Sequence, residues 1–140
     1  MHLADINIWL ALAFEVHGHH ERALRWFDQA APQSCAMCRF VQYGFLRLAS
    51  DPAVFGEEAV TLPVAWGLYD QLLADDRVSY LTEPLELEQA WRRHTATDTY
   101  SHKVWADGYL AAFADAAGIG VVSFDKGFEE FDGVISTIPE

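Results

Sequence analysis

The chain has 140 residues, of which 51% are hydrophobic and 14% aromatic, so we expect one globular domain over residues 1–140 and not a disordered segment. No apolar run reaches the ~18–20 residues of a membrane span, and two cysteines without a secretion signal favour a cytoplasmic protein. The net charge of −12 opposes nucleic-acid binding in bulk, so any nucleic-acid role would require a local basic rim or a metal ion.

Short apolar segments alternate with amphipathic ones along the chain, which predicts strands alternating with helices. In chain order we expect strand 2–4, helix 6–14, helix 18–30, strand 34–38, helix 39–50, helix 62–76, strand 77–81, helix 83–95, helix 101–118, strand 119–124 and edge strand 133–138. Asp51-Pro52 should stop the third helix, and Gly118 should close the longest one. Strands separated by helices favour an α/β fold with a mostly parallel sheet and helices on both faces.

Three aspartates lie where such a fold places its sites, beyond the carboxyl ends of the strands. Asp5 follows the first strand, and Asp125 follows strand 119–124. Asp107 lies in the helix before that strand, and its i−3, i+3, i+4 and i+7 neighbours are apolar, so it should point inward. Because three close carboxylates cannot all stay ionised without a cation, the pattern predicts a Mg²⁺ or Mn²⁺ site.

Two of these aspartates also have an ordinary structural interpretation. Asp5 could serve only as the N-cap of the helix that follows it. Asp125 could be a turn residue before Lys126-Gly127. Asp107 caps nothing obvious, so the joint occurrence of the three carries more weight than any one of them.

Two other clusters suggest different chemistry, and we assign both to structure. His17, His19 and His20 could bind Zn²⁺, but they open a helix and no further ligand with suitable spacing lies nearby. Cys35 and Cys38 form a C-x-x-C pair, as in thioredoxin-like redox sites. Such sites place the first cysteine at a helix N-terminus, whereas this pair leads from a strand into a helix.

Four segments spread over nearly the whole chain carry a family resemblance. They are "LADINIWLALA", "HGHHERALRWF", "CRFVQYGFLRLAS" and "WADGYLAAFADAAGIGVVSFDKGF", the last being the most specific. The chain resembles the PIN-domain ribonucleases, specifically the VapC-type toxins of toxin–antitoxin pairs. This resemblance implies a three-layer α/β/α sandwich, a Mg²⁺ or Mn²⁺ site, an RNA substrate, a homodimer and inhibition by a cognate antitoxin.

The resemblance also assigns candidate site residues. Asp5, Asp107 and Asp125 match family acids, so they are expected to bind the metal and to act in catalysis. Gln42 stands where a glutamate is usual and is expected to act there as a neutral ligand or water-holder; it brings no charge and cannot act as a base. Ser123 could support a metal-bound water or a ligand through its hydroxyl, although it could also be a simple strand-end serine.

Three cations are candidates for gripping the phosphate backbone of the substrate. They are Arg39, Arg47 and Lys126, and Arg47 is the strongest because it falls at the family's Gly-Phe-x-Arg segment. For each of them, an ordinary solvated charge is the favoured alternative.

The sequence therefore predicts a divalent-metal-dependent endoribonuclease toxin, and the resemblance implies products with a 5′-phosphate and a 3′-hydroxyl. Two alternatives remain at this point. A weakened PIN domain would bind RNA or its antitoxin without efficient cleavage, which Gln42 favours. A phospho-receiver-like binding module would also place acids at strand ends, but it needs a further acid beside the first, where this chain has Ala4.

Overall fold

The computed structural model describes residues 1–140 and is built around a five-stranded sheet in which all neighbouring strands are parallel. The strands are β1 (His2–Ala4), β2 (Cys35–Met37), β3 (Val78–Tyr80), β4 (Gly120–Val122) and β5 (Ser136–Thr137). Their order across the sheet is β3-β2-β1-β4-β5, which confirms both the parallel sheet and the last strand as an edge strand.

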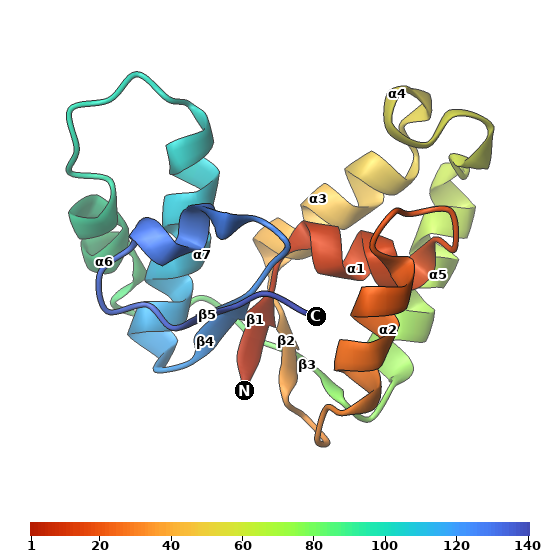
Figure 1. The fold of residues 1–140 in the computed structure, drawn as a ribbon, viewed down its shortest axis with the longest axis horizontal. Helices are drawn as coiled ribbons and strands as arrows, with labels where there is room; N and C mark the ends of the chain where they lie inside the picture. The colour runs from red at the N-terminus through yellow and green to blue at the C-terminus, as the bar shows by residue number, and fades with distance from the viewer.

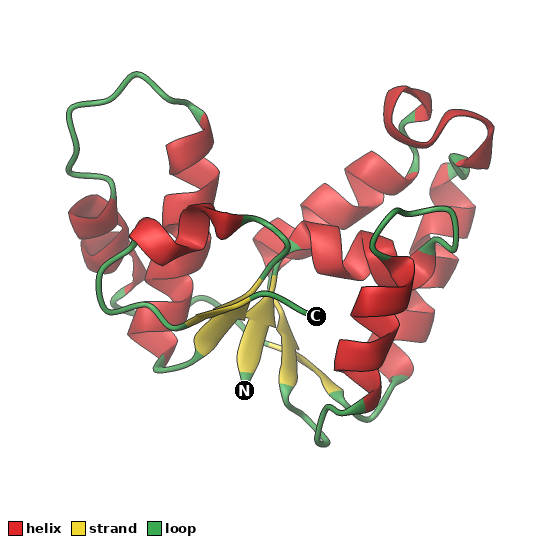
Figure 2. Cartoon of the chain, in the orientation of Figure 1, coloured by secondary structure: helices red, strands yellow, loops and turns green.

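Seven α-helices cover the sheet in two layers. They are α1 (Ile6–Ala13), α2 (His20–Asp28), α3 (Arg39–Ala49), α4 (Pro52–Phe55), α5 (Leu62–Ala74), α6 (Leu87–His94) and α7 (Lys103–Ala117). Helices α6 and α7 pack together on one side of the sheet, while α1, α2, α3 and α5 lie on the other (Figure 1). Figure 2 shows the sheet between these helical layers, which is the expected three-layer α/β/α sandwich.

The strand order explains where a site can form. The chain adds β1, β2 and β3 in one direction and then returns to place β4 on the other side of β1. Such a reversal leaves a crevice beyond the carboxyl ends of the two strands. The backbone N–H of Asp5 donates to the carbonyl of Val122 at 2.9 Å, so the segments that follow β1 and β4 begin side by side.

Helix α7 packs between the sheet and α6 through a long buried stretch of mostly apolar residues. Its residues from Gly108 to Ala114 are buried against the sheet and α6. The helix ends at Gly118, whose φ of 68° is left-handed, as the sequence predicts for a C-terminal glycine. Because α7 ends at a defined residue, the position of its first turns relative to the sheet is defined as well.

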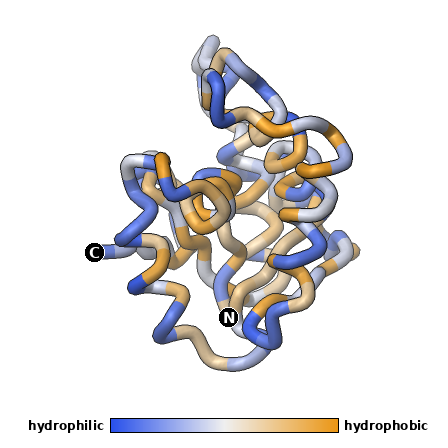
Figure 3. The backbone as a smooth tube through the Cα atoms, turned by 90° about the vertical axis from the view of Figure 1, so that its right-hand side faces the viewer, coloured by the Kyte–Doolittle hydropathy of each residue, from blue (hydrophilic) through white to orange (hydrophobic).

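The core is one cluster in which the three central strands are almost fully buried. Figure 3 shows apolar stretches gathered in the interior, with hydrophilic segments frequent in the peripheral turns. A buried hydrogen bond from the Trp9 indole to the Ala4 carbonyl, at 3.0 Å, ties α1 to the end of β1. At the crossing of α1 and α3, a Cβ on Gly44 would lie 2.2 Å from the Ile6 Cδ1 atom, so only glycine permits this approach.

The structure also contains three short helices that the sequence did not predict. They are α4, the 3₁₀ turn η1 (Gly56–Glu58) and the 3₁₀ helix η2 (Lys126–Glu130). Each is too short to give a periodic pattern, so periodicity could not reveal them. Across the whole chain, none of the helices has both the length and the apolar character needed to cross a membrane.

Candidate active site

Asp5 is both an N-cap and the centre of a polar network. Its Oδ1 accepts the Ile6 backbone N–H at 2.7 Å, which caps α1 and confirms the structural interpretation. Its Oδ2 accepts from the Ser123 hydroxyl at 2.7 Å and from the Asn7 amide at 3.1 Å. The pKa of Asp5 is raised, chiefly by burial, although the hydrogen bonds from Ser123 and Ile6 work in the opposite direction. Capping α1 therefore uses only one oxygen of this carboxylate, and the other belongs to a separate polar network.

Ser123 joins the two strand ends. It is buried, its hydroxyl donates to Asp5, and its oxygen accepts from the Asn7 amide at 3.0 Å and from the Asp125 backbone N–H at 2.9 Å. The Asn7 carbonyl oxygen in turn accepts the Phe124 backbone N–H at 3.2 Å. With all its hydrogen bonds made inside the protein, Ser123 orients Asp5 and the turn after β4.

Asp125 is held from two sides. Its Oδ1 accepts the Gly127 backbone N–H at 2.8 Å, so it also caps η2, which confirms the turn interpretation. Its Oδ2 forms a short ion pair with the ammonium group of Lys103, from the start of α7. Lys103 and then Gly127 lower the pKa of Asp125, and Asp125 raises the pKa of Lys103.

Asp107 is the least compensated member of the cluster. Its pKa is raised to about 6, mainly by burial and further by the charges of Asp125 and Asp5, while Lys103 acts against the shift. A Cβ built on Gly127 would lie 3.2 Å from the Asp125 Oδ1 and 3.8 Å from the Asp107 Oδ2. The structure thus brings together the three aspartates that the sequence singled out.

The donor set suits a hard divalent cation. As they stand, the side chains form no group of three His, Cys, Asp or Glu ligands around one point. The cause is that Asp5 and Asp125 direct their oxygens to backbone N–H groups, to Ser123 and to Lys103. The three carboxylates nevertheless offer only oxygen donors, and they carry more negative charge than the ammonium group of Lys103 can neutralise. Hard divalent cations prefer such a donor set.

Gln42 lies in α3, buried, with its amide oxygen accepting from the Arg39 guanidinium. No hydrogen bond joins it to any of the three aspartates. Arg39 also lies over the ring of Tyr80, with its Cζ 5.4 Å from the ring centroid. The α3 residue that packs against α7 is Phe40, whose ring centroid is 4.9 Å from that of Tyr109. The role expected of Gln42 stays a prediction.

Two expected cations remain, and neither side chain forms an ion pair with the acid cluster. Arg47 is exposed in the last turn of α3, and Lys126 is exposed directly after Asp125. Neither forms an ion pair with a protein carboxylate, so both side chains are free for an anionic ligand.

The histidine and cysteine clusters make structural contacts. The ring of His19 stacks on Phe124 with centroids 4.3 Å apart, and the Nδ1 atom of His17 accepts the His19 backbone N–H at 3.1 Å. Cys35 and Cys38 are free and buried, and burial raises the pKa of each thiol, the opposite of what a redox site requires.

Sequence reasoning missed Lys103 and gave Asn7 no role. Lys103 lies four residues before Asp107, and this i,i+4 spacing within a helix was a usable signal. Asn7 is the only other polar residue in the apolar run after Asp5, which was also a visible anomaly. The partners of these two residues could not be predicted. Asn7 and Ser123, like Lys103 and Asp125, lie far apart in the sequence and in different elements.

Comparison with known proteins places this geometry in context. A family model described as "PIN domain" matches residues 3–134. Over 139 residues the chain is 39% identical to Ribonuclease VapC41 of Mycobacterium tuberculosis, covering 96% of this chain and 95% of that protein. The fold is similar to that of Mycobacterium tuberculosis VapC20, a sarcin-ricin loop cleaving toxin, with a TM-score of 0.68 and 20% identity over 96% of this chain and 98% of that one. It is also similar to VapBC2 from Rickettsia felis, bound to a DNA fragment from their promoter, with a TM-score of 0.70 and 10% identity over 99% and 98% of the chains.

Proposed function

Because the chain belongs to the PIN-domain family, we propose that it is a divalent-metal-dependent endoribonuclease toxin of the VapC type, neutralised by a cognate antitoxin. The observation that carries this proposal is the convergence of Asp5, Asp107 and Asp125 at the switch point of the sheet. The family match also answers the phospho-receiver alternative, which lacked the acid beside Asp5.

We place Mg²⁺ or Mn²⁺ among the carboxylates of Asp5, Asp107 and Asp125. A divalent ion bound there would lower the pKa of a water molecule and neutralise the charge that develops on the phosphate. The raised pKa of Asp107 supports this placement, since a buried carboxylate beside two others is unfavourable until a cation compensates it.

The protein's own residues prepare the site. Ser123 and Asn7 hold one Asp5 oxygen, so the carboxylate keeps a single orientation. Lys103 pairs with Asp125, and any cation that binds Asp125 more strongly would release its ammonium group. The freed ammonium would lie at the mouth of the cluster, where it can contact a phosphate oxygen. Arg47 and Lys126 stay our candidates for phosphates farther along the RNA.

The same surplus of negative charge supports a basic antitoxin segment. An arginine that reaches the aspartates would compete with the metal, so excess Mg²⁺ should weaken the complex more than NaCl at matched ionic strength. Equal weakening by the two salts would place the contact away from the acids. The proposal includes a homodimer in the cytoplasm, which sedimentation of the purified protein and fractionation of cells would check.

The decisive experiment is RNA cleavage by purified, antitoxin-free protein. We expect cleavage with Mg²⁺ or Mn²⁺, none after chelation by EDTA, and a loss of at least about 100-fold in Asp107→Asn. The matched control is Asp115→Asn, which removes the same charge from the same helix. Asp115 lies about two turns farther along α7, near its C-terminal end, where it pairs with Arg93 and His94, so its loss should leave cleavage intact.

Each outcome of this assay decides between the alternatives. Cleavage that survives EDTA, or that is equal in Asp107→Asn and wild type, would reject the metal-dependent nuclease. RNA binding without any cleavage would favour the weakened PIN domain that Gln42 suggests. Melting curves of each variant establish that a loss of activity is not a loss of fold.

A further inference from the structure

An aromatic cavity lies at the same carboxyl end of the sheet as the acid cluster and is not used by the proposed chemistry. Its volume is about 500 Å³, within the usual range of small-molecule sites. Its apolar walls come from three elements: Phe40 of α3, Trp91 of α6, and Trp105 and Tyr109 of α7. These residues come from distant parts of the sequence, so only the fold brings the rings together.

Three aromatic rings form one wall of this pocket, and one of them, Trp105, is largely exposed. The ring of Trp91 is nearly perpendicular to those of Trp105 and Tyr109, with centroids 6.1 Å and 5.3 Å away. The Trp91 indole donates to the backbone carbonyl of Trp105 at 3.1 Å, which holds the corner. The Trp105 side chain is 61% exposed, so a face of this ring is open to a flat ligand.

Helix α7 joins this aromatic pocket to the acids. Trp105 and Tyr109 line the pocket, while Lys103 and Asp107 belong to the acid cluster. Successive residues of a helix are about 100° apart, so the two pairs lie on nearly opposite sides of the same turns. The sheet supplies the closer link, because Arg39 and Glu83 of the pocket follow β2 and β3 at the same edge where Asp5 follows β1. A ligand that reaches both the pocket and the acids must carry negative charge at one point and a flat apolar group at another.

We propose that the aromatic pocket binds one nucleobase of the RNA strand, next to the phosphate held at the acid cluster. This inference rests on the nuclease function proposed above. The polar side chains of Arg39, Glu83 and His102 complete the lining and supply hydrogen-bond donors and acceptors for the edge of a base. Glu83 uses one carboxylate oxygen to accept from the Tyr109 hydroxyl at 2.7 Å, which leaves the other oxygen for the ligand.

The charge of the protein favours a base as the occupant. With 21 acidic residues against 9 lysines and arginines, the chain has few cations for a phosphate backbone. Stacking of bases on aromatic rings does not depend on net charge and is the other common source of affinity for single-stranded nucleic acids. Since every base has a flat face, the polar rim would decide which base is preferred.

The test measures binding under conditions that exclude cleavage. The probe is a fluorescein-labelled single-stranded RNA of about ten nucleotides, in EDTA, compared with versions that lack one base at each successive position. The variants are Trp105→Ala and Trp105→Phe. Trp105→Ala keeps the backbone carbonyl that receives the Trp91 hydrogen bond, so the fold should survive. The matched control is Trp66→Ala, an exposed tryptophan in α5 that does not line the pocket.

We expect Trp105→Ala to weaken binding by about five-fold or more, Trp105→Phe to recover most of the affinity, and Trp66→Ala to bind as wild type does. One abasic position should weaken the wild type to a similar extent and should cause no further loss in Trp105→Ala. This non-additivity identifies the base that occupies the pocket.

Three results would overturn the inference. The first is unchanged binding by Trp105→Ala, and the second is additive losses at every abasic position. The third is a loss confined to the antitoxin complex or to the dimer, which would make the pocket a protein interface. Because these measurements need no metal and no cleavage, they separate this inference from the nuclease proposal. A wild-type protein that binds base-dependently but never cleaves would reject only the latter.

Discussion

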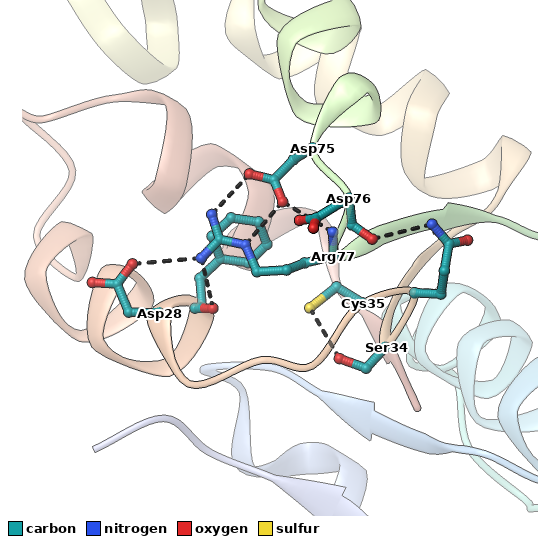
Figure 4. A network of polar contacts seen from close by, with 8 residues as sticks. Asp28, Ser34, Cys35, Asp75, Asp76 and Arg77 are labelled. Atoms are coloured by element: carbon teal, nitrogen blue, oxygen red, sulfur yellow. Dashed lines mark hydrogen bonds and ion pairs between the residues drawn. The ribbon is translucent and has the colours of Figure 1, made fainter.

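Two acidic clusters lie at opposite ends of the sheet, and they are built in opposite ways. At the amino end, just before β3, Asp75 and Asp28 surround Arg77 (Figure 4). At the carboxyl end, Asp5, Asp107 and Asp125 share the single ammonium group of Lys103. The first cluster is compensated within the fold, and the second is not.

The Arg77 network satisfies nearly every group that it contains. The guanidinium donates to both oxygens of Asp75 at 2.8 Å and to the Phe27 carbonyl at 3.1 Å, and its Cζ lies 3.8 Å from the centroid of the Phe27 ring. These bonds lower the pKa of Asp75 to about 2. The charge-assisted bidentate pair with Asp75 holds the loop before β3 in shape, and the contacts of Arg77 with Phe27 and Asp28 fasten this loop to α2.

The carboxyl end shows the reverse effect on the same residue type. Burial and neighbouring carboxylates raise the pKa of Asp107 to about 6. A fold that compensates acids fully at one end has no structural need for uncompensated acids at the other. Surplus charge with a strongly shifted pKa is what we expect of a functional site, and compensation within the fold is what we expect of a structural one.

The largest expected effect comes from breaking the compensated end. Arg77→Met should lower the free energy of unfolding by about 2–3 kcal/mol, because it leaves Asp75 and the Phe27 carbonyl without their donor. Urea denaturation measures the loss. RNA cleavage at a temperature where the variant is folded should equal that of the wild type. A loss of cleavage by the folded variant would mean that the two ends are coupled.

The same comparison predicts a gain at the other end. Asp107→Asn should raise the free energy of unfolding by about 1–2 kcal/mol at pH 7, because it removes a buried, repelled charge; the full pKa shift would give about 3 kcal/mol, which partial exposure to solvent reduces. Asp115→Asn, in the same helix, should instead lose stability, because the pKa of Asp115 is lowered by His94 and Arg93. If both variants lose stability, the charge on Asp107 is compensated after all.

The two ends should also differ in how the free energy of unfolding depends on pH. We expect each aspartate to change this free energy by less than about 1 kcal/mol per pH unit. The folded-state pKa of Asp107 is above its ordinary value, so its destabilising effect appears as the pH rises from about 4 to 6. Asp107→Asn should therefore match the wild type near pH 4 and exceed it at pH 7. Asp75 behaves oppositely, since its contribution is present above about pH 4 and is lost as the pH falls toward 2. Denaturation curves at several pH values separate the two.

The sequence predicted the acid cluster better than the Arg77 network. Asp5 and Asp125 each follow a strand, and parallel strands end at the same edge of a sheet, so their proximity could be predicted. The apolar neighbours of Asp107 along its helix predicted that it points inward. The Arg77 network could not be predicted, because Asp28 and Arg77 lie 49 positions apart and no periodicity links them. The aromatic pocket was missed for the same reason, since its rings meet only through the packing of α3, α6 and α7.

The smallest effect is expected at Gln42, where the structure changes what the sequence alone predicts. The family pattern suggested that Gln42→Glu would add a fourth charge to the acid cluster and would cost stability. In the structure the side-chain oxygen of Gln42 already accepts from Arg39, so a glutamate there would form an ion pair. We now expect the free energy of unfolding without metal to change by less than about 1 kcal/mol.

The metal dependence of Gln42→Glu then decides which neighbours position 42 has. If Arg39 holds the new carboxylate, half-maximal cleavage should require nearly the same Mg²⁺ concentration as in the wild type. Arg39→Met combined with Gln42→Glu is the matched control, because it removes the pairing cation and leaves the glutamate free. If Gln42→Glu alone is less stable than the wild type without metal, and reaches half-maximal cleavage at a much lower Mg²⁺ concentration, residue 42 turns toward the acids. Position 42 would then belong to the uncompensated end, as the family pattern first suggested.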